Sequence, residues 1–442
     1  MSARDLVLTL VIFSSLPFCF FKPWVGVLVY SWIGYMNPHR LTWVVNNYPF
    51  ALWASAATFA GLMVTRDRQP MPRTREVWLL GLFWFVTLLS TAFAAFYPVD
   101  AWDQFSKVTK ILLGTCLTLV LFQDVRKLRW LLWVIAGSIG FYGLKGGIWA
   151  LTTGGGNQVL GPPGSFIAGN TEIGLALNMI LPMLLILRRS EKRVWLRHLL
   201  LAAFIFTIPA ILITYSRGAF LGLAAILLIL AARSRAKVLA LSLLLVGVPL
   251  AMHYLPSKWF DKMETIQTYE EDSSAMGRIW AWRLATRIGA DRPLLGAGFQ
   301  CFSKESYARY LPEAPFGGTD AHNIFYQVLA EHGVTGLLAY VALLISTILT
   351  LWKIKRQTKR IPHARELYNW AEMIEVSLIA FIASGFFLSR SYFDLFYHLI
   401  TITIVLSVIA RRVARGESVP GLEAPVAARI EAPPRAAVAA FS

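Results

Sequence analysis

Residues 198–232 read HLLLAAFIFTIPAILITYSRGAFLGLAAILLILAA, two apolar runs separated by Thr214-Tyr215-Ser216-Arg217-Gly218. A helix needs about 18 apolar residues to cross the hydrocarbon core of a membrane. Because almost no loop remains between the runs, the stretch predicts two neighbouring spans that reverse direction at the membrane surface. A bundle of membrane-spanning helices is therefore expected.

The composition of the whole chain agrees with this prediction. Of 442 residues, 56% are hydrophobic and 15% are charged, and the mean hydropathy is +0.56. Soluble proteins are usually about 45–50% apolar and about 25% charged. Apolar segments predict an all-α polytopic membrane protein with about 12 transmembrane helices, which after the N-terminal region lie at 50–64, 76–96, 108–122, 128–150, 172–187, 198–215, 218–232, 238–254, 322–352, 370–388 and 395–410.

The charge is unevenly distributed along the chain. There are 42 basic and 25 acidic residues, a net charge of +17. Half of the basic residues fall in five loops, at 66–75, 126–129, 188–197, 233–237 and 353–365. The positive-inside rule makes these loops cytoplasmic and the loops 37–49, 97–107, 151–171 and 255–321 external. The excess charge therefore indicates membrane orientation and does not indicate a nucleic-acid partner.

The N-terminal region has an apolar run at 6–21, followed by Lys22-Pro23 and a second apolar run. This pattern predicts an uncleaved anchor, because no small-residue cleavage site follows the first run. We expect residues 5–36 to form one kinked crossing with the N-terminus inside, although two short crossings are the alternative. Three cysteines give no disulfide framework.

The predicted organisation has four parts. Residues 1–254 form the N-terminal transmembrane helices, 255–321 a large periplasmic loop, 322–410 the C-terminal helices and 411–442 a disordered cytoplasmic tail. A polar insertion as long as 255–321 is expected to fold as a lid over the outer mouth. Within it, 276–289 has an amphipathic helical pattern that suits a helix along the bilayer surface.

Arg217 is the most informative single residue. It lies at the outer end of two spans, where an arginine opposes the positive-inside bias and is costly in contact with lipid. An interfacial anchor is the ordinary explanation. The guanidinium fork matches phosphate oxygens, so we favour a role in binding a phosphate-bearing ligand.

Two further residues carry chemistry at the outer side. Arg278 follows Gly277 at the start of the amphipathic stretch, and taken alone it is better explained as a solvated or headgroup-facing charge. His322 opens the segment 322–352, which as one helix is about 46 Å long and exceeds the hydrocarbon core. His322 is therefore expected in the outer vestibule, where a helix N-terminus favours the neutral imidazole of a general base. A helix-capping role is equally compatible with its position.

Other features are weaker. Lys107 and Lys145 lie near the outer ends of two spans and are expected to approach an anionic ligand, although interfacial lysines are common there. No cluster with metal-ligand spacing occurs on the outer side, so no metal is expected. The glycine-rich stretches form no nucleotide-binding pattern, so no cofactor is expected either.

Three motifs in order resemble the O-antigen ligase and O-antigen polymerase superfamily. They are Ser216-Arg217-Gly218 with Gly222, Gly277-Arg278 with Pro293, Gly296 and Gly298, and His322-Asn323 with Glu331 and Gly333. The resemblance covers residues 198–345. The first 166 residues, with Tyr35-Met36-Asn37-Pro38-His39-Arg40 and Gly161-Pro162-Pro163-Gly164-Ser165-Phe166, are similar to the exosortase-associated O-glycosylation ligases.

This resemblance implies a GT-C-like glycosyltransferase in the bacterial inner membrane with its active site facing the periplasm. The donor would be a glycan linked to undecaprenyl diphosphate, moved en bloc to a hydroxyl of lipid A-core with inversion and without a metal. Arg217 and Arg278 would hold the diphosphate, helped by Lys107 and Lys145, and His322 would deprotonate the acceptor.

Alternatives remain. An O-antigen polymerase and a protein O-oligosaccharyltransferase use the same donor and motifs with a different acceptor. A transporter of lipid-linked sugars is a different class. Transporters usually show internal repeats and charges at the midplane of the membrane, and the sequence has neither, which favours an enzyme.

Overall fold

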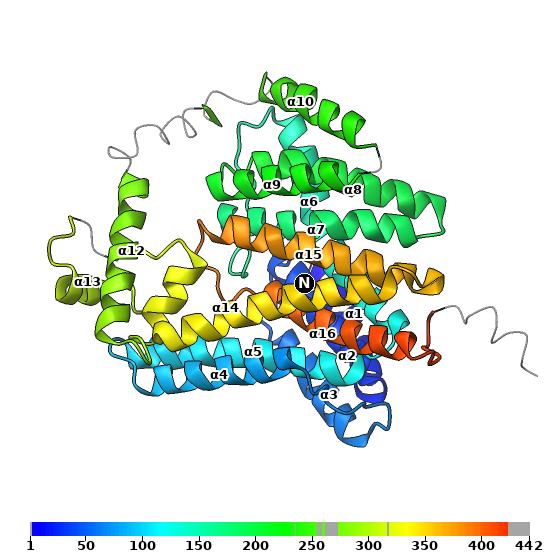
Figure 1. Ribbon diagram of the computed structural model, residues 1–442, viewed down its shortest axis with the longest axis horizontal. Helices are drawn as coiled ribbons and strands as arrows, with labels where there is room; N and C mark the ends of the chain where they lie inside the picture. The colour runs from blue at the N-terminus through cyan, green and yellow to red at the C-terminus, as the bar shows by residue number, and fades with distance from the viewer. Residues whose placement is uncertain (1, 235, 254–258, 261–272, 316–317, 423–442) are drawn as a thin grey trace, which may run out of the picture.

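The computed structural model describes residues 2–234, 236–253, 259–260, 273–315 and 318–422, and every regular element in those ranges is a helix (Figure 1). Eight helices are long and apolar enough to cross a membrane. They are α1 (Ala3–Phe21), α4 (Arg75–Ala92), α5 (Pro98–Leu121), α6 (Val125–Thr152), α7 (Asn170–Ser190), α8 (Val194–Leu212), α14 (Ile324–Thr358) and α16 (Asp394–Ala414). The prediction of an all-α polytopic membrane protein is confirmed.

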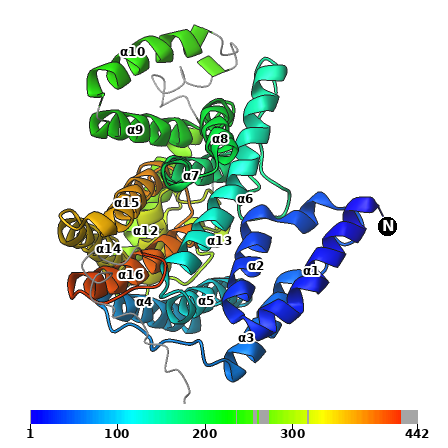
Figure 2. The ribbon, with the colours of Figure 1, turned by 90° about the vertical axis from the view of Figure 1, so that its right-hand side faces the viewer.

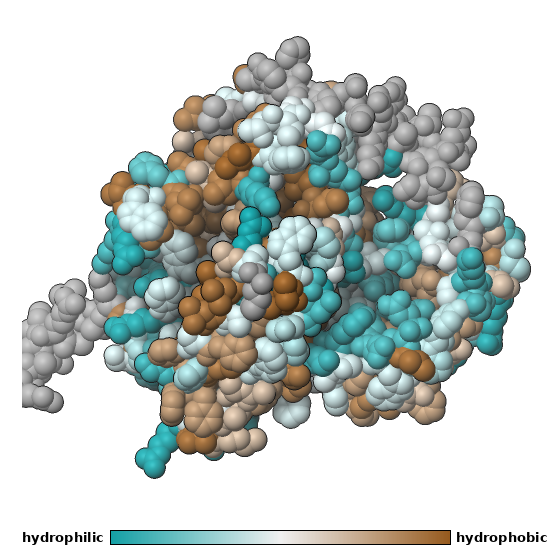
Figure 3. Space-filling model, turned by 180° about the vertical axis from the view of Figure 1, so that it is seen from behind, coloured by the Kyte–Doolittle hydropathy of each residue, from teal (hydrophilic) through white to brown (hydrophobic). Residues whose placement is uncertain are grey.

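Further helices complete the bundle, namely α2 (Pro23–Met36), α3 (Phe50–Val64), α9 (Arg217–Arg233), α10 (Lys237–His253) and α15 (Arg365–Gly385). The face in Figure 3 has hydrophobic residues concentrated over its middle and hydrophilic residues towards both ends. α7, α15 and α16 form the centre, and their apolar side chains are nearly all buried. The outer helices α1 and α8 expose most of their surface, as helices that face lipid do.

The N-terminal region differs from the prediction. Residues 5–36 form two helices, because the chain leaves helical geometry at Lys22 and Pro23 begins a new helix, a position that suits proline. The Asp5 carboxylate accepts hydrogen bonds from the backbone N–H groups of Val44 and Val45, which follow α2. The start of α1 therefore lies beside the chain that leaves α2, and the predicted single crossing is wrong.

The five basic loops gather at one end of the bundle, as the charge pattern predicts. Ion pairs connect residues of four of these loops with one another or with α15, at Lys127–Asp67 (2.6 Å), Arg129–Glu366 (2.7 Å), Arg233–Glu375 (2.9 Å) and Lys355–Glu375 (2.6 Å). We call the end of the bundle where the basic loops lie the basic end.

The part of the predicted C-terminal tail that the structure describes is folded. α16 continues through Arg411 and Arg412 to Ala414. Val419 is buried, and the Pro420 carbonyl accepts a hydrogen bond from the N–H of Val125 at the start of α6 (3.4 Å). Residues 423–442 lie outside the described residues.

The long helix that follows His322 has a break. Asn323 caps α14 by accepting from the N–H groups of Phe325 and Tyr326, so His322 precedes the cap and lies outside the helix. Gly333 then adopts φ 69° and ψ −169°, a conformation that only glycine populates readily. The predicted single helix is therefore two helical segments that meet at Gly333.

The turn at 293–298 packs into this break. The Pro293 carbonyl accepts from the N–H of Val334 (2.7 Å), and the Ala330 carbonyl accepts from the N–H of Ala297 (2.9 Å). A Cβ at Gly296 would lie 2.6 Å from the Ala330 carbonyl oxygen. Glycine is thus required at position 296 in the turn and at position 333 in the helix. The motif that contains Gly296 and the motif that contains Gly333 pack against each other.

The polar insertion contains two described helices, α12 (Ser273–Asp291) and α13 (Lys304–Tyr310). Residues 255–258, 261–272 and 316–317 of the predicted lid lie outside the described residues. α12 runs across the end of α14 (Figure 1), where Trp282 stacks on Tyr326 with ring centroids 5.2 Å apart. Arg283 and Arg287 are exposed while Leu284 and Ile288 are buried, so the predicted amphipathic helix is present.

We predict that Gly333→Ala destabilises the protein by at least about 1–3 kcal/mol, since the φ/ψ region is nearly closed to alanine and the new Cβ would lie 2.5 Å from the Pro293 carbonyl oxygen. The thermal unfolding midpoint in detergent should fall clearly. Gly137→Ala on α6 is the control, because nothing lies within 4 Å of its Cβ position. An unchanged midpoint for Gly333→Ala would contradict the role given to the break.

Candidate functional site

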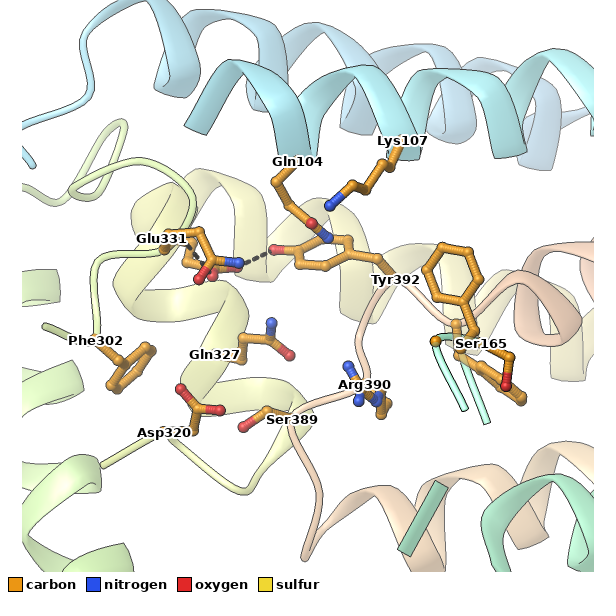
Figure 4. A pocket seen from close by; sticks show the side chains of 14 residues that line it. Gln104, Lys107, Ser165, Phe302, Asp320, Gln327, Glu331, Ser389, Arg390 and Tyr392 are labelled. Atoms are coloured by element: carbon orange, nitrogen blue, oxygen red, sulfur yellow. Dashed lines mark hydrogen bonds between the residues drawn. The ribbon is translucent and has the colours of Figure 1, made fainter. Parts of the chain in front are cut away.

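A polar cavity of about 450 Å³ lies near the starts of α5 and α14, opposite the ends of these helices at the basic end. Figure 4 shows the side chains that line it. α5 forms one wall and α14 another, and the segment 386–393 between α15 and α16 crosses between them. Most of the side chains that line the cavity bear a hydrogen-bonding or charged group, namely Gln104, Lys107, Ser165, Gln300, Asp320, Gln327, Glu331, Ser389, Arg390 and Tyr392.

His322 is fixed beside this cavity by its backbone. Its N–H donates to the Ser389 hydroxyl (2.7 Å), and the next residue, Asn323, donates its side-chain amide to the Phe386 carbonyl (3.1 Å). The φ of His322 is 44°, in the left-handed region that few residues other than glycine adopt. The capping geometry of Asn323 and the contact with Ser389 together hold this conformation.

Charged side chains surround the His322 imidazole. Partial burial and the nearby Arg278 guanidinium lower the pKa of His322 below its ordinary value of 6.5. Asp320 and Glu172 act in the opposite direction, and Arg390 adds a further lowering effect. The net direction is downward, so the imidazole is neutral near pH 7 and able to accept a proton.

Arg278 reaches this region from α12. Gly277 packs against Thr319, where a Cβ would lie 3.3 Å from the Thr319 methyl carbon. Thr319 belongs to the short segment that leads to His322. The structure therefore brings Arg278 and His322 together, as the electrostatic influence on the imidazole also requires.

Arg217 is the first residue of α9, and the Ser216 hydroxyl caps this helix by accepting from the N–H of Ala219 (3.2 Å). Gly218 packs closely against Phe387, since a Cβ at Gly218 would lie 2.9 Å from the Phe387 Cβ. Arg217 therefore lies beside the 386–393 segment, which also binds His322 through Ser389. Arg217 and His322 thus border one segment, and Arg278 lies near His322.

The two lysines have different surroundings. Lys107 lines the cavity on the α5 wall, near Gln104 (Figure 4). Lys145 is exposed on α6 and is not among the residues that line the cavity. The structure therefore brings Lys107, and not Lys145, to the cavity.

Sequence reasoning missed Arg390. Its guanidinium lines the cavity and forms an ion pair with Glu172 at the start of α7 (2.6 Å). The available signal was its place in the short connection between the last two predicted spans, on the same side as Arg217. This is the same exception to the positive-inside bias that identified Arg217.

A buried polar network lies under the cavity. The Tyr392 hydroxyl donates to Glu331 Oε2 (2.5 Å) and lies 2.7 Å from His332 Nε2. Glu331 Oε1 accepts from the N–H of Gln300 (3.3 Å), and the Ser90 hydroxyl lies 2.8 Å from His332 Nδ1. The sequence identified Glu331 only as a motif position and gave no partner for it.

A second cavity of about 210 Å³ adjoins the first. Gly164, Ser165 and Phe166 line both cavities, and Tyr35 and His398 line the second. His398 also lines a third cavity of about 520 Å³ between α2, α3 and α5, whose walls are largely apolar. We call this third cavity the apolar groove.

Among the described residues, no group of three or more His, Cys, Asp or Glu side chains is arranged to hold a metal ion. Arginine, lysine, histidine and amide groups dominate the site. These groups are suited to binding anions and hydroxyls and to moving a proton.

Comparison with protein families gives two matches. Residues 202–341 match the O-Antigen ligase family, and residues 3–191 match a family of unknown function (DUF5935). No curated protein matches the chain. The first match confirms the resemblance to the O-antigen ligase superfamily, and its range contains Arg217, Arg278 and His322. The similarity of the N-terminal part to exosortase-associated ligases stays a prediction.

We predict that the reactivity of His322 with diethyl pyrocarbonate, which requires the neutral imidazole, has its midpoint below pH 6.5. Arg278→Gln should raise this midpoint because a positive neighbour is removed, and Asp320→Asn should lower it. Mass spectrometry of the peptide that contains His322 measures the modification. Shifts of both variants in the same direction would contradict the assigned electrostatics.

Proposed function

We propose that this protein is an O-antigen ligase-type glycosyltransferase that moves a glycan from undecaprenyl diphosphate to a hydroxyl of lipid A-core on the periplasmic face of the inner membrane. The family match supports the coarser statement, a membrane glycosyltransferase of the O-antigen ligase or polymerase type. The observation that carries the proposal is that Arg217 and His322, from distant parts of the chain, border the 386–393 segment, and that Arg278 lies near His322.

Bond breaking in this reaction depends on the two arginines. The bond between the anomeric carbon and the diphosphate oxygen breaks, and negative charge develops on the departing diphosphate. Two fixed guanidinium groups stabilise that charge in the transition state and offer paired donors to phosphate oxygens. Arg217 and Arg278 fill this role, and no metal is needed.

Bond formation depends on His322. The acceptor hydroxyl attacks the anomeric carbon and transfers its proton to the imidazole, which is neutral because burial and Arg278 lower its pKa. Attack opposite to the leaving diphosphate inverts the anomeric carbon.

Inversion also suggests where the acceptor binds. Helix α9 and the first part of α12, which carry the two arginines, lie on one side of the layer formed by α14 and α15, and α5 lies on the other side (Figure 1). The polar cavity is on the α5 side and borders Ser389 and Asp320, next to His322. A saccharide acceptor in this cavity would approach the anomeric carbon opposite to the diphosphate.

The lining suits a sugar acceptor. Amide and carboxylate groups such as Gln104, Gln327 and Asp320 hydrogen-bond hydroxyls, and Phe302 offers an aromatic face. Lys107 faces the same cavity, so we assign it to the acceptor side. Lys145 has no role in the proposal.

The apolar groove favours a lipid-borne acceptor over a peptide. It begins near the cavity, and its largely apolar walls suit a hydrocarbon chain. An O-antigen polymerase, which also uses a lipid-linked acceptor, is the main alternative. A protein O-oligosaccharyltransferase and a transporter of lipid-linked sugars have no comparable support.

The decisive experiment is an in vitro transfer assay with a glycan on undecaprenyl diphosphate and three acceptors, namely lipid A-core, a second lipid-linked glycan and a peptide. We expect transfer to lipid A-core, and His322→Ala should lower its rate about 100- to 10,000-fold, as loss of a general base does. Donor binding should persist in the variant. Transfer at the wild-type rate would remove His322 as the base, and the absence of transfer to all acceptors by the wild-type protein would refute the function.

The acceptor site has its own test. Gln104→Ala should raise the KM for the acceptor about five- to tenfold through the loss of one hydrogen bond, with little change in the KM for the donor. Asp103→Ala is the matched control, because Asp103 is exposed on the same helix and does not line the cavity. A change confined to the donor KM would instead make the cavity part of the donor site.

A further inference from the structure

A second charged cavity lies at the basic end, far from the proposed active site. It has a volume of about 200 Å³ and lies between the start of α4, the end of α14 and the last turns of α16. Figure 2, which views the molecule from this side, shows these three helices next to one another. Four cationic side chains line it, namely Arg73, Arg75, Lys353 and Arg411.

The charge of this cavity is not balanced by the protein. In the part of the chain that the structure describes, none of the four cations forms an ion pair. One carboxylate lines the cavity, Glu76, which is 2% exposed and accepts hydrogen bonds from Ser346 (2.6 Å) and Thr350 (2.7 Å). One carboxylate can balance the charge of one of the four cations, so the cavity keeps a net positive charge.

A second groove, distinct from the apolar groove between α2, α3 and α5, adjoins this cavity. It has a volume of about 760 Å³, and Arg73 and Arg411 line both spaces. Val77, Trp78 and Val408 provide its apolar surface, and Trp78 is 74% exposed. Exposed tryptophan is typical of the depth at which lipid headgroups meet acyl chains.

The combination of cations and apolar surface identifies the ligand class. Soluble phosphates would use the cations and leave the groove empty, whereas a zwitterionic lipid would leave the positive charge unbalanced. Basic pockets between transmembrane helices are typical sites for anionic lipid headgroups. An anionic phospholipid satisfies both parts at once.

We propose that this cavity and its groove bind one anionic phospholipid. Its phosphate lies among Arg73, Arg75, Lys353 and Arg411, and an acyl chain follows Val77, Trp78 and Val408. The bound lipid connects three helices that are distant in sequence, and so it stabilises the basic end of the bundle. This site is independent of the proposed glycosyl transfer.

The test measures lipid binding to the purified full chain by native mass spectrometry and by thermal unfolding in detergent. The probes are phosphatidylglycerol, cardiolipin, phosphatidylcholine and inorganic phosphate. We expect phosphatidylglycerol or cardiolipin to remain bound and to raise the unfolding midpoint, and phosphatidylcholine to do neither. Arg73→Gln combined with Arg411→Gln should weaken binding about thirtyfold, given the contribution of each cation near a lipid surface.

Arg66→Gln combined with Arg68→Gln is the matched control, because both arginines are exposed in the same connection and line neither space. It should change the affinity less than twofold. Lys353→Gln provides a second variant from another helix and should weaken binding severalfold. Equal weakening by the control pair would overturn the site in favour of general surface attraction. Equal binding of phosphatidylcholine, or stabilisation by inorganic phosphate alone, would overturn the lipid assignment.

Discussion

The proposed active site depends on the break in α14 at Gly333 and on the hydrogen bonds between this break and the 293–298 turn. Where the helix is interrupted, the 293–298 turn supplies the backbone hydrogen bonds that the helix lacks. The same break places Glu331 and His332 against Tyr392, which belongs to the 386–393 segment, and against Ser90 at the end of α4. Buried polar groups of this kind are stable only when every partner is present. The hydrogen bonds of Tyr392 with Glu331 and His332 therefore hold the 386–393 segment, which binds His322 through Ser389.

The charged residues at the two ends of the bundle are arranged differently. At the basic end, cations are numerous, and several are paired with carboxylates such as Glu366 and Glu375. At the opposite end, two cations have specific surroundings: Arg278 lies near His322, and Arg390 forms an ion pair with Glu172. The proposed binding of a diphosphate beside a neutral base is compatible with this second arrangement, since a large excess of unpaired cations would bind anions without selectivity.

The sequence predicted the bundle well because hydrophobic run length and loop charge are local properties. It also predicted Arg217, Arg278 and His322 as site residues, and the structure places Arg278 near His322 and Arg217 beside the segment that binds His322. It missed the separation of α1 and α2, since Lys22-Pro23 is equally compatible with a kink in one helix and with a turn between two helices. It missed the break at Gly333 and the partners of Glu331, because these depend on contacts between residues about 35 to 240 positions apart. Arg390 could have been predicted from its position in an outer connection, against the positive-inside bias. Nothing in the sequence indicated its ion pair with Glu172.

The hydrogen bonds of Asp5 have a mechanical consequence. They tie the start of α1 to the chain after α2, and α3 packs mainly on these two helices, so the three form a unit that joins the rest of the bundle chiefly through α2. Helices α2 and α3 form one wall of the apolar groove, and α5 in the main bundle forms the other. A small rotation of this unit would change the width of the groove while leaving the distances between His322 and the two arginines unaltered. In the proposed function, the width of the groove that would admit a lipid chain could thus change independently of the groups proposed to react.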